Sequence, residues 1–243
     1  MEILSLLLAI ALALIHISAS SWKFLELIPQ RRWKSLAGGV SIAYLFLDIL
    51  PELSHSQAQL EDIDIPFLAF LEDHVYLLSF VGLTVFYGLE SLALRSRTFN
   101  QHTQGRDWTS LEIFGLHIFS FAVYNAILGY LLQEFAQQGV TASILFFIAF
   151  GLHFMVNDRS LREHHKHLYD KYGRWILAGA IVAGAVLGET LAVHEGTIAV
   201  IHALIAGAII LNILKEELPE ERESCFWSFL TGAIAYGVLI FLV

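Results

Sequence analysis

Cysteine is almost absent from this chain: Cys225 is the single thiol among 243 residues. One thiol excludes an intrachain disulfide and any metal cage built from several cysteines. Charge is also scarce, since 15% of the residues are charged and 56% are hydrophobic. A chain of this length with that balance is too apolar to be an ordinary soluble domain.

Eight apolar runs account for this composition. Most are roughly 16 to 23 residues long, which is enough for a helix to cross a hydrocarbon core about 30 Å thick. We therefore predict an all-α polytopic membrane protein in which residues 1–243 form a single domain of eight transmembrane helices. No basic residue precedes the first run, so we expect a retained anchor rather than a cleaved signal peptide. The predicted spans are 3–20, 35–50, 75–94, 110–132, 140–157, 174–193, 197–214 and 225–243.

Lys and Arg are missing from three connections, those after the second, fourth and sixth spans. All fourteen basic residues lie in or at the border of the connections after the first, third, fifth and seventh spans. An excess of basic residues marks the cytoplasmic side of a membrane protein. The pattern therefore predicts an integral membrane protein with both termini on the non-cytoplasmic side.

The chain carries two weak internal repeats. Shifting it by 168 residues aligns the second span with the seventh, and shifting it by 149 residues aligns the third with the eighth. Aligned spans run in opposite directions across the membrane, so helices 1–3 and 6–8 form an inverted repeat around a central pair, helices 4 and 5. Inverted repeats are common in secondary transporters, whose substrate sites lie near the midplane. The aligned pairs include Gly39 with Gly207, Pro51 with Pro219 and Tyr87-Gly88 with Tyr236-Gly237.

Four polar side chains inside the predicted spans are candidate site residues. His117 lies in the fourth span, His153 and Asn157 lie in the fifth, and Glu189 lies in the sixth. Ionisable groups inside a bilayer are costly and usually face a bundle interior or an aqueous cavity. Two imidazoles and an amide oxygen suit a borderline divalent ion such as zinc. Neutral histidines that only bond neighbouring helices explain the pattern equally well, and Glu189 fits a ligand, a proton carrier or a histidine partner.

Three other polar features have structural interpretations. His16 is expected to be a satisfied core residue, and Glu90 is expected to reach the interface or to pair with Arg95. Residues 163–167 are predicted to be a cytoplasmic connection, and their three histidines give them a metal-attracting composition. A chelating or regulatory role for this tract stays open beside that of an ordinary loop.

Two motifs resemble helices of the ZIP (Zrt/Irt-like) family of divalent-metal transporters. Residues 38–52, which end in Leu50-Pro51-Glu52, resemble the family's second helix, and residues 202–220 resemble its seventh. The resemblance covers nearly the whole chain and implies eight spans and a metal site on helices four and five. The leading histidines of that site match His117 and His153, but Phe121 stands where the family has a bridging carboxylate. The resemblance therefore implies a reduced, single-metal site.

We predict a membrane transporter that moves a divalent transition metal, with zinc first, by alternating access. The predicted ligands are His117, His153, Asn157 and Glu189, and Zn²⁺ is the transported or bound ion rather than a firm cofactor. An enzyme is not predicted, because no His-Glu-x-x-His or comparable arrangement occurs. Expected partners are the lipid bilayer and the metal ion, with a homodimer left open and no nucleic acid. Two alternatives stay open: a ZIP-like fold with a changed substrate, and a non-transporting membrane partner or metal sensor.

Overall fold

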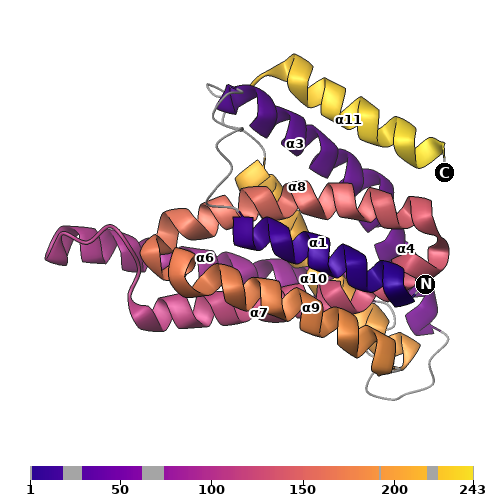
Figure 1. The fold of residues 1–243 in the computed structure, drawn as a ribbon, viewed down its shortest axis with the longest axis horizontal. Helices are drawn as coiled ribbons and strands as arrows, with labels where there is room; N and C mark the ends of the chain where they lie inside the picture. Colours follow the sequence, from indigo (N-terminus) through magenta and orange to yellow (C-terminus); the bar gives the residue numbers. More distant parts are fainter. Residues whose placement is uncertain (1, 19–28, 62–73, 192, 218–223, 243) are drawn as a thin grey trace. The chain divides into compact units, whose positions relative to one another are not determined.

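The computed structural model of the protein describes residues 2–18, 29–61, 74–191, 193–217 and 224–242, and these contain helices and no strand. The predicted all-α fold class is therefore confirmed at this level (Figure 1). The helices are α1 (Glu2–Ser18), α3 (Gln30–Tyr44), α4 (Leu50–Glu61), α6 (Val75–Gln104), α7 (Leu111–Gln138), α8 (Val140–His165), α9 (Arg174–Thr190), α10 (Glu195–Asn212) and α11 (Phe226–Phe241). Three π-helical segments adjoin them: η1 (Leu45–Ile49), η2 (Tyr169–Gly173) and η3 (Ile213–Glu217).

Helices lie over all eight predicted apolar runs, and several begin where the runs begin. In the part of the chain that the structure describes, five helices are long and apolar enough to cross a membrane. They cover Arg31–Ala58, Val75–Gln104, Leu111–Gln138, Val140–His165 and Gly196–Lys215, and two shorter apolar helices cover Ile3–Ser18 and Phe226–Phe241. The structure is thus that of an all-helical protein with several helices suited to a membrane.

Local signals fix the ends of the helices that carry the candidate site. Ser110 caps α7, where its hydroxyl oxygen accepts a hydrogen bond from the backbone N–H of Ile113. Gly139 separates α7 from α8 with φ of +122°, a conformation that favours glycine. Lys166 ends α8 with φ of +49°. The single residue between α7 and α8 makes these two helices neighbours in space.

The chain divides into two compact units, each made of segments from both halves of the sequence. The first unit takes residues 1–33 and 89–191, and the second takes 34–88 and 192–242. In the first unit α1 packs on α7, α8 and α9, and α7 packs closely on α9. A Cβ atom built on Gly184 would lie 1.9 Å from the carbonyl oxygen of Ala126, so the backbones of α7 and α9 touch there. Such close approach through small residues is typical of membrane helices.

Glycine contacts also join the helices of the second unit. A Cβ atom on Gly232 of α11 would lie 2.2 Å from the carbonyl oxygen of Leu36 of α3. One on Gly82 of α6 would lie 2.0 Å from the carbonyl oxygen of Leu204 of α10. Figure 1 shows α3 and α11 side by side along their length. The second unit therefore contains two helix pairs, α3 with α11 and α6 with α10, in direct backbone contact.

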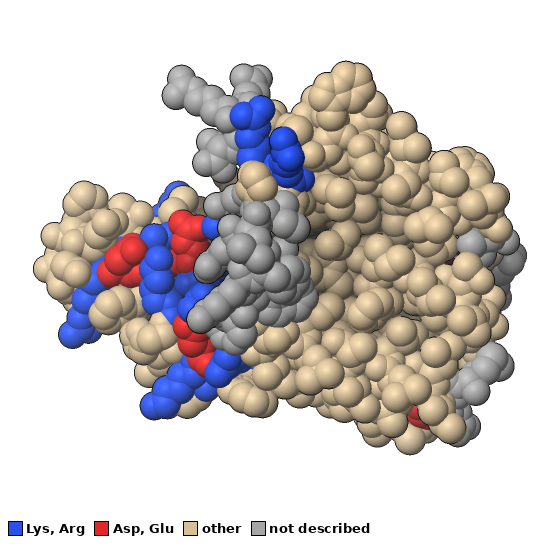
Figure 2. All heavy atoms as spheres, turned by 45° about the horizontal axis from the view of Figure 1, so that its top comes forward, with Lys and Arg blue, Asp and Glu red and all other residues tan. Residues whose placement is uncertain are grey.

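Figure 2 shows a group in which Lys and Arg side chains lie next to Asp and Glu side chains. One group in the first unit joins the C-terminal part of α6, the connection that follows it and the end of α8 through ion pairs. Asp107 is central to this group, because both Arg97 and Lys166 contact it. These charged side chains lie at the ends of helices that are otherwise largely apolar.

Candidate ion-binding site

Buried acidic and histidine side chains lie in one unit. Among the residues that the structure describes, all seven buried Asp, Glu and His side chains belong to the first unit. Burying such groups among apolar helices is costly, so they usually pair with one another or mark an ion path. They are His16, Glu90, His117, His153, Asp158, His164 and His165.

Four of these side chains form what we call the His–Glu cluster: Glu90 of α6, His117 of α7, and His164 and His165 of α8. His117 is 1% exposed, and its Nδ1 lies 2.9 Å from Nε2 of His165. Its Nε2 lies 3.0 Å from Oε1 of Glu90, which is an ion-pair distance, but at an angle that forms no hydrogen bond. Nε2 of His164 lies 3.7 Å from the other carboxylate oxygen of Glu90. Three helices thus bring donors typical of zinc ligands to one buried place.

Thr109 holds the cluster from the connection between α6 and α7. Its hydroxyl oxygen lies 2.6 Å from Nδ1 of His165, and its backbone N–H donates to the carbonyl oxygen of His164. Both ring nitrogens of His165 are therefore engaged, one by Thr109 and one by His117. The ring of Phe114 meets the His165 ring edge-on at 5.3 Å between centroids. These contacts fix the orientation of His165 and, through it, that of His117.

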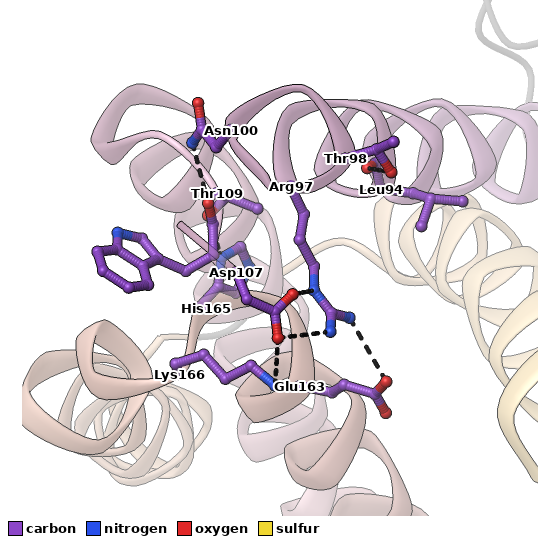
Figure 3. Close-up of polar contacts among 10 residues, drawn as sticks. Leu94, Arg97, Thr98, Asn100, Asp107, Thr109, Glu163, His165 and Lys166 are labelled. Carbon is purple, nitrogen blue, oxygen red and sulfur yellow. Dashed lines mark hydrogen bonds and ion pairs between the residues drawn. The ribbon is translucent and has the colours of Figure 1, made fainter. Parts of the chain in front are cut away.

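Ion pairs join the C-terminal part of α6, the connection after it and the end of α8, as Figure 3 shows. Nε of Arg97 donates to Asp107 at 2.7 Å, and Nζ of Lys166 lies 3.4 Å from the same carboxylate. The hydrogen bond from Arg97 is the main reason that the pKa of Asp107 is lowered from its ordinary value.

A cavity of about 350 Å³ lies beside the connection between α6 and α7, and its lining includes Thr109, Arg106, Trp108 and His167. The cavity therefore reaches the residue that holds His165.

A second cluster consists of His16, Asn125, Asp158 and Tyr169. Nδ1 of His16 lies 2.8 and 3.0 Å from the two carboxylate oxygens of Asp158, and both side chains are fully buried. Nε2 of His16 lies 2.9 Å from the amide oxygen of Asn125, whose nitrogen donates to the carbonyl oxygen of Phe121. Both ring nitrogens of His16 thus lie within hydrogen-bond distance of oxygen atoms on other helices, Asp158 on α8 and Asn125 on α7.

Tyr169 completes this second cluster by donating its hydroxyl to Asp158 at 2.5 Å. Burial, with the nearby charge of Asp158, raises the pKa of Tyr169 well above its ordinary value. The interpretation of His16 as a satisfied core residue agrees with these contacts, which join α1, α7, α8 and η2.

The structure gives three of the four predicted ligands separate partners, and the fourth, Asn157, is buried. His117 belongs to the His–Glu cluster, whereas Nε2 of His153 lies 3.0 Å from the hydroxyl of Tyr124. Asn157 is 3% exposed, and its amide nitrogen has no hydrogen-bond partner in the described part of the chain. Glu189 accepts a hydrogen bond from the hydroxyl of Ser5.

The ring of Phe121 contacts both His117 and Tyr124, so aromatic side chains link the two predicted histidines. Over the residues described, no three His, Cys, Asp or Glu side chains are arranged to hold one metal ion together. The metal site of His117, His153, Asn157 and Glu189 stays a prediction.

Two structural interpretations from the sequence were wrong. Residues 163–165 belong to α8 rather than to a loop, and His164 and His165 are buried. Glu90 is 5% exposed and faces His117, so its expected reach to the interface is wrong, while the alternative, a pair with Arg95, stays a prediction. A signal for His165 was present in the sequence, because Phe154, Asn157, Leu161 and His165 recur at helical spacing and are all buried.

No family model, no curated protein and no solved structure matches this chain. The ZIP resemblance therefore rests on the motifs in residues 38–52 and 202–220.

Proposed function

We propose that this chain is a ZIP-like membrane protein that moves a divalent transition metal, with zinc first, by alternating access. One observation carries the proposal: five histidines are buried in one unit of apolar helices, together with Glu90 and Asp158. Imidazole is a common ligand of zinc, and ionisable groups within membrane helices usually mark the path of an ion. The cargo site would centre on His117, with His153, Asn157 and Glu189 as the other predicted ligands.

The proposed topology has eight spans with both termini on the non-cytoplasmic side. It is supported by helices over every apolar run and by the restriction of Lys and Arg to alternate connections. The cavity beside Thr109 would then open toward the cytoplasmic side, since it lies at the basic end of α6. The lipid bilayer and the metal ion are the proposed partners, and a homodimer is compatible with the exposed apolar helix faces.

Matching irregularities in the helices support the proposed inverted repeat. The π-helical segments η1 and η3 begin at Leu45 and Ile213 and so are offset by 168 residues, the shift that aligns the two sequence motifs. Two glycine contacts are also related, because Gly232 approaches Leu36 and Gly82 approaches Leu204. Leu36 and Leu204 are again 168 residues apart, whereas the two glycines are 150 apart, one more than the 149-residue sequence shift. Equivalent π segments in two repeats would give a transporter paired flexible points, and π-helical turns are frequent at functional sites.

Uptake by proteoliposomes tests the proposed function. The native chain, a His117→Ala/His153→Ala double variant and a His102→Ala control are reconstituted and supplied with zinc, cadmium or manganese. His102 is an exposed histidine at the end of α6, so its loss controls for the removal of a surface imidazole. We expect saturable flux from the native chain and the control and none from the double variant. No flux of any of the three metals through inserted, folded protein would refute divalent-metal transport.

A changed substrate is the second candidate, and one feature of the His–Glu cluster favours it. Nδ1 of His117 and Nε2 of His165 contact each other at 2.9 Å, a separation suited to a shared proton. Movement of protons or another monovalent cation would use such contacts without a preformed metal site. Vesicles that acidify in response to a pH gradient but take up no metal would support this candidate over the first.

A further inference from the structure

We propose that Glu90 supplies the carboxylate ligand of the cargo site and binds a divalent transition metal together with Nε2 of His117, with Nε2 of His164 as third donor. This inference rests on the proposed function and deepens it. Glu90 is on α6, whereas none of the ligands predicted from the sequence is on that helix. A site that includes Glu90 therefore lies where α6, α7 and the end of α8 meet.

The orientation of His117 makes Nε2 its ligand atom. Nδ1 is engaged by His165, and His165 is held in turn by Thr109. Nε2 is buried, makes no hydrogen bond and lies 3.0 Å from the Glu90 carboxylate. Metal-bound histidines typically have the second ring nitrogen fixed by a neighbour in this way. His165 is thus a positioning residue, and Nε2 of His117 is left directed at Glu90.

Distances between donors support a shared ion. Zinc bonds of about 2.0–2.2 Å in a tetrahedral arrangement put neighbouring donor atoms about 3.3–3.6 Å apart. The separation from His117 Nε2 to Glu90 Oε1 is 3.0 Å, and that from His164 Nε2 to Glu90 Oε2 is 3.7 Å. The first distance is slightly below this range and the second is slightly above it. In the described part of the chain no three His, Cys, Asp or Glu side chains surround a single point. The proposed site therefore requires Glu90, His117 and His164 to move closer together as the ion binds.

Charge explains why a carboxylate is needed here. Neutral imidazoles leave the full charge of a divalent ion uncompensated among apolar helices, where electrostatic interactions are weakly screened. On α7 the residue one turn after His117 is Phe121, which is fully buried and contacts the His117 ring. Glu90 approaches the same histidine from α6. The negative charge beside His117 would then come from α6.

Binding of Co²⁺, a spectroscopic substitute for zinc, tests this assignment on the purified full-length chain. The variants are Glu90→Gln, which keeps shape and removes charge, Glu90→Asp, which keeps charge, and Glu112→Gln as control. Glu112 is an exposed carboxylate in the first turn of α7. We expect Glu90→Gln to weaken Co²⁺ binding by more than the roughly tenfold to hundredfold that loss of an outer-shell partner costs. We expect Glu90→Asp to keep the visible absorption bands of bound Co²⁺, and Glu112→Gln to behave as the native chain.

The outcomes separate a ligand from a structural ion pair. Unchanged Co²⁺ affinity in a folded Glu90→Gln variant, or no Co²⁺ binding by the native chain, would overturn the assignment. If Glu90→Gln does not fold, X-ray absorption of the zinc-loaded native chain decides, because a shell without a carboxylate oxygen overturns it as well. Metal uptake that persists in Glu90→Gln leaves transport standing and removes Glu90 from it. Binding that depends on Glu90 without any uptake leaves the site standing and refutes transport.

Discussion

Replacing Asp158 by Asn is expected to destabilise the first unit strongly. The carboxylate of Asp158 faces His16 at 2.8 Å, and both side chains are 0% exposed. Removing one member of a buried ion pair leaves the other charge uncompensated and costs about 3–5 kcal/mol. For a chain of this size each kcal/mol shifts the melting temperature by about 2–4 °C. The variant should therefore melt about 6 to 20 °C below the native chain.

Thermal unfolding in detergent at pH 7, followed by circular dichroism at 222 nm, measures this shift. The matched control is Asp107→Asn, which breaks a pair between a half-exposed carboxylate and Arg97. Partly exposed pairs contribute little because water and salt screen them, so the control should melt close to the native chain. A double-mutant cycle with His16→Gln then isolates the pairwise contribution.

Two results would refute this reasoning. One is an Asp158→Asn variant that melts within about 2 °C of the native chain, since that is less than 1 kcal/mol. The other is an equal loss from Asp158→Asn in the native and the His16→Gln backgrounds, which would mean that the two side chains are not coupled. Either result would show that the buried pair does not join α1 to α8 energetically.

Two further predictions concern helix packing and pH. Gly184→Ala should destabilise the chain by about 1–3 kcal/mol, because its Cβ would lie 1.9 Å from the Ala126 carbonyl oxygen. Gly179→Ala on the same helix meets nothing within 4 Å, so it should be neutral or stabilising in the same melting assay; equal melting of the two variants would contradict the packing. The pKa of Asp107 is lower in the folded chain than in the unfolded chain, chiefly because of its hydrogen bond from Arg97. The pair with Arg97 therefore stabilises the fold fully above the ordinary carboxyl pKa, and this stabilisation is lost as the pH falls through the lowered pKa of the folded state. Amide exchange at residues 105–110 should therefore increase relative to the rest of the chain below about pH 4, and an equal increase in Asp107→Asn would assign it to other groups.

Helix positions were predictable because apolar length and turn residues act locally. Val140 and Arg174 begin α8 and α9 at the residues where the apolar runs begin. The ends were less predictable, since α6 continues to Gln104 and α8 to His165 through polar residues that lie past the apolar runs. Helical hydrogen bonds do not require apolar side chains, so hydropathy marks the part of a helix suited to a membrane and not the whole helix.

The candidate site was predictable only in part. His117 stood out as an ionisable group inside an apolar run, but its contact with Glu90 joins two helices whose pairing no local pattern indicates. The same holds for His16 and Asp158, which are 142 residues apart in the chain. A single sequence shows which polar groups are costly to bury, but it does not show which of them meet. Composition suggested a loop for residues 163–167, whereas tertiary contacts with Thr109 and His117 bury His165.

The interleaved segments of the two units have a consequence for biosynthesis. The backbone N–H of Cys225, just before α11, donates to the hydroxyl of Ser35 on α3 at 2.8 Å, across 190 residues. At a synthesis rate of about 5–20 residues per second, α3 waits roughly 10 to 40 s before that partner is made. During this interval Gly39 of α3, where a Cβ atom would lie 2.0 Å from the carbonyl oxygen of Phe229 on α11, also lacks its partner. A chain whose synthesis stops before α11 therefore leaves α3 without the backbone contacts that α11 supplies.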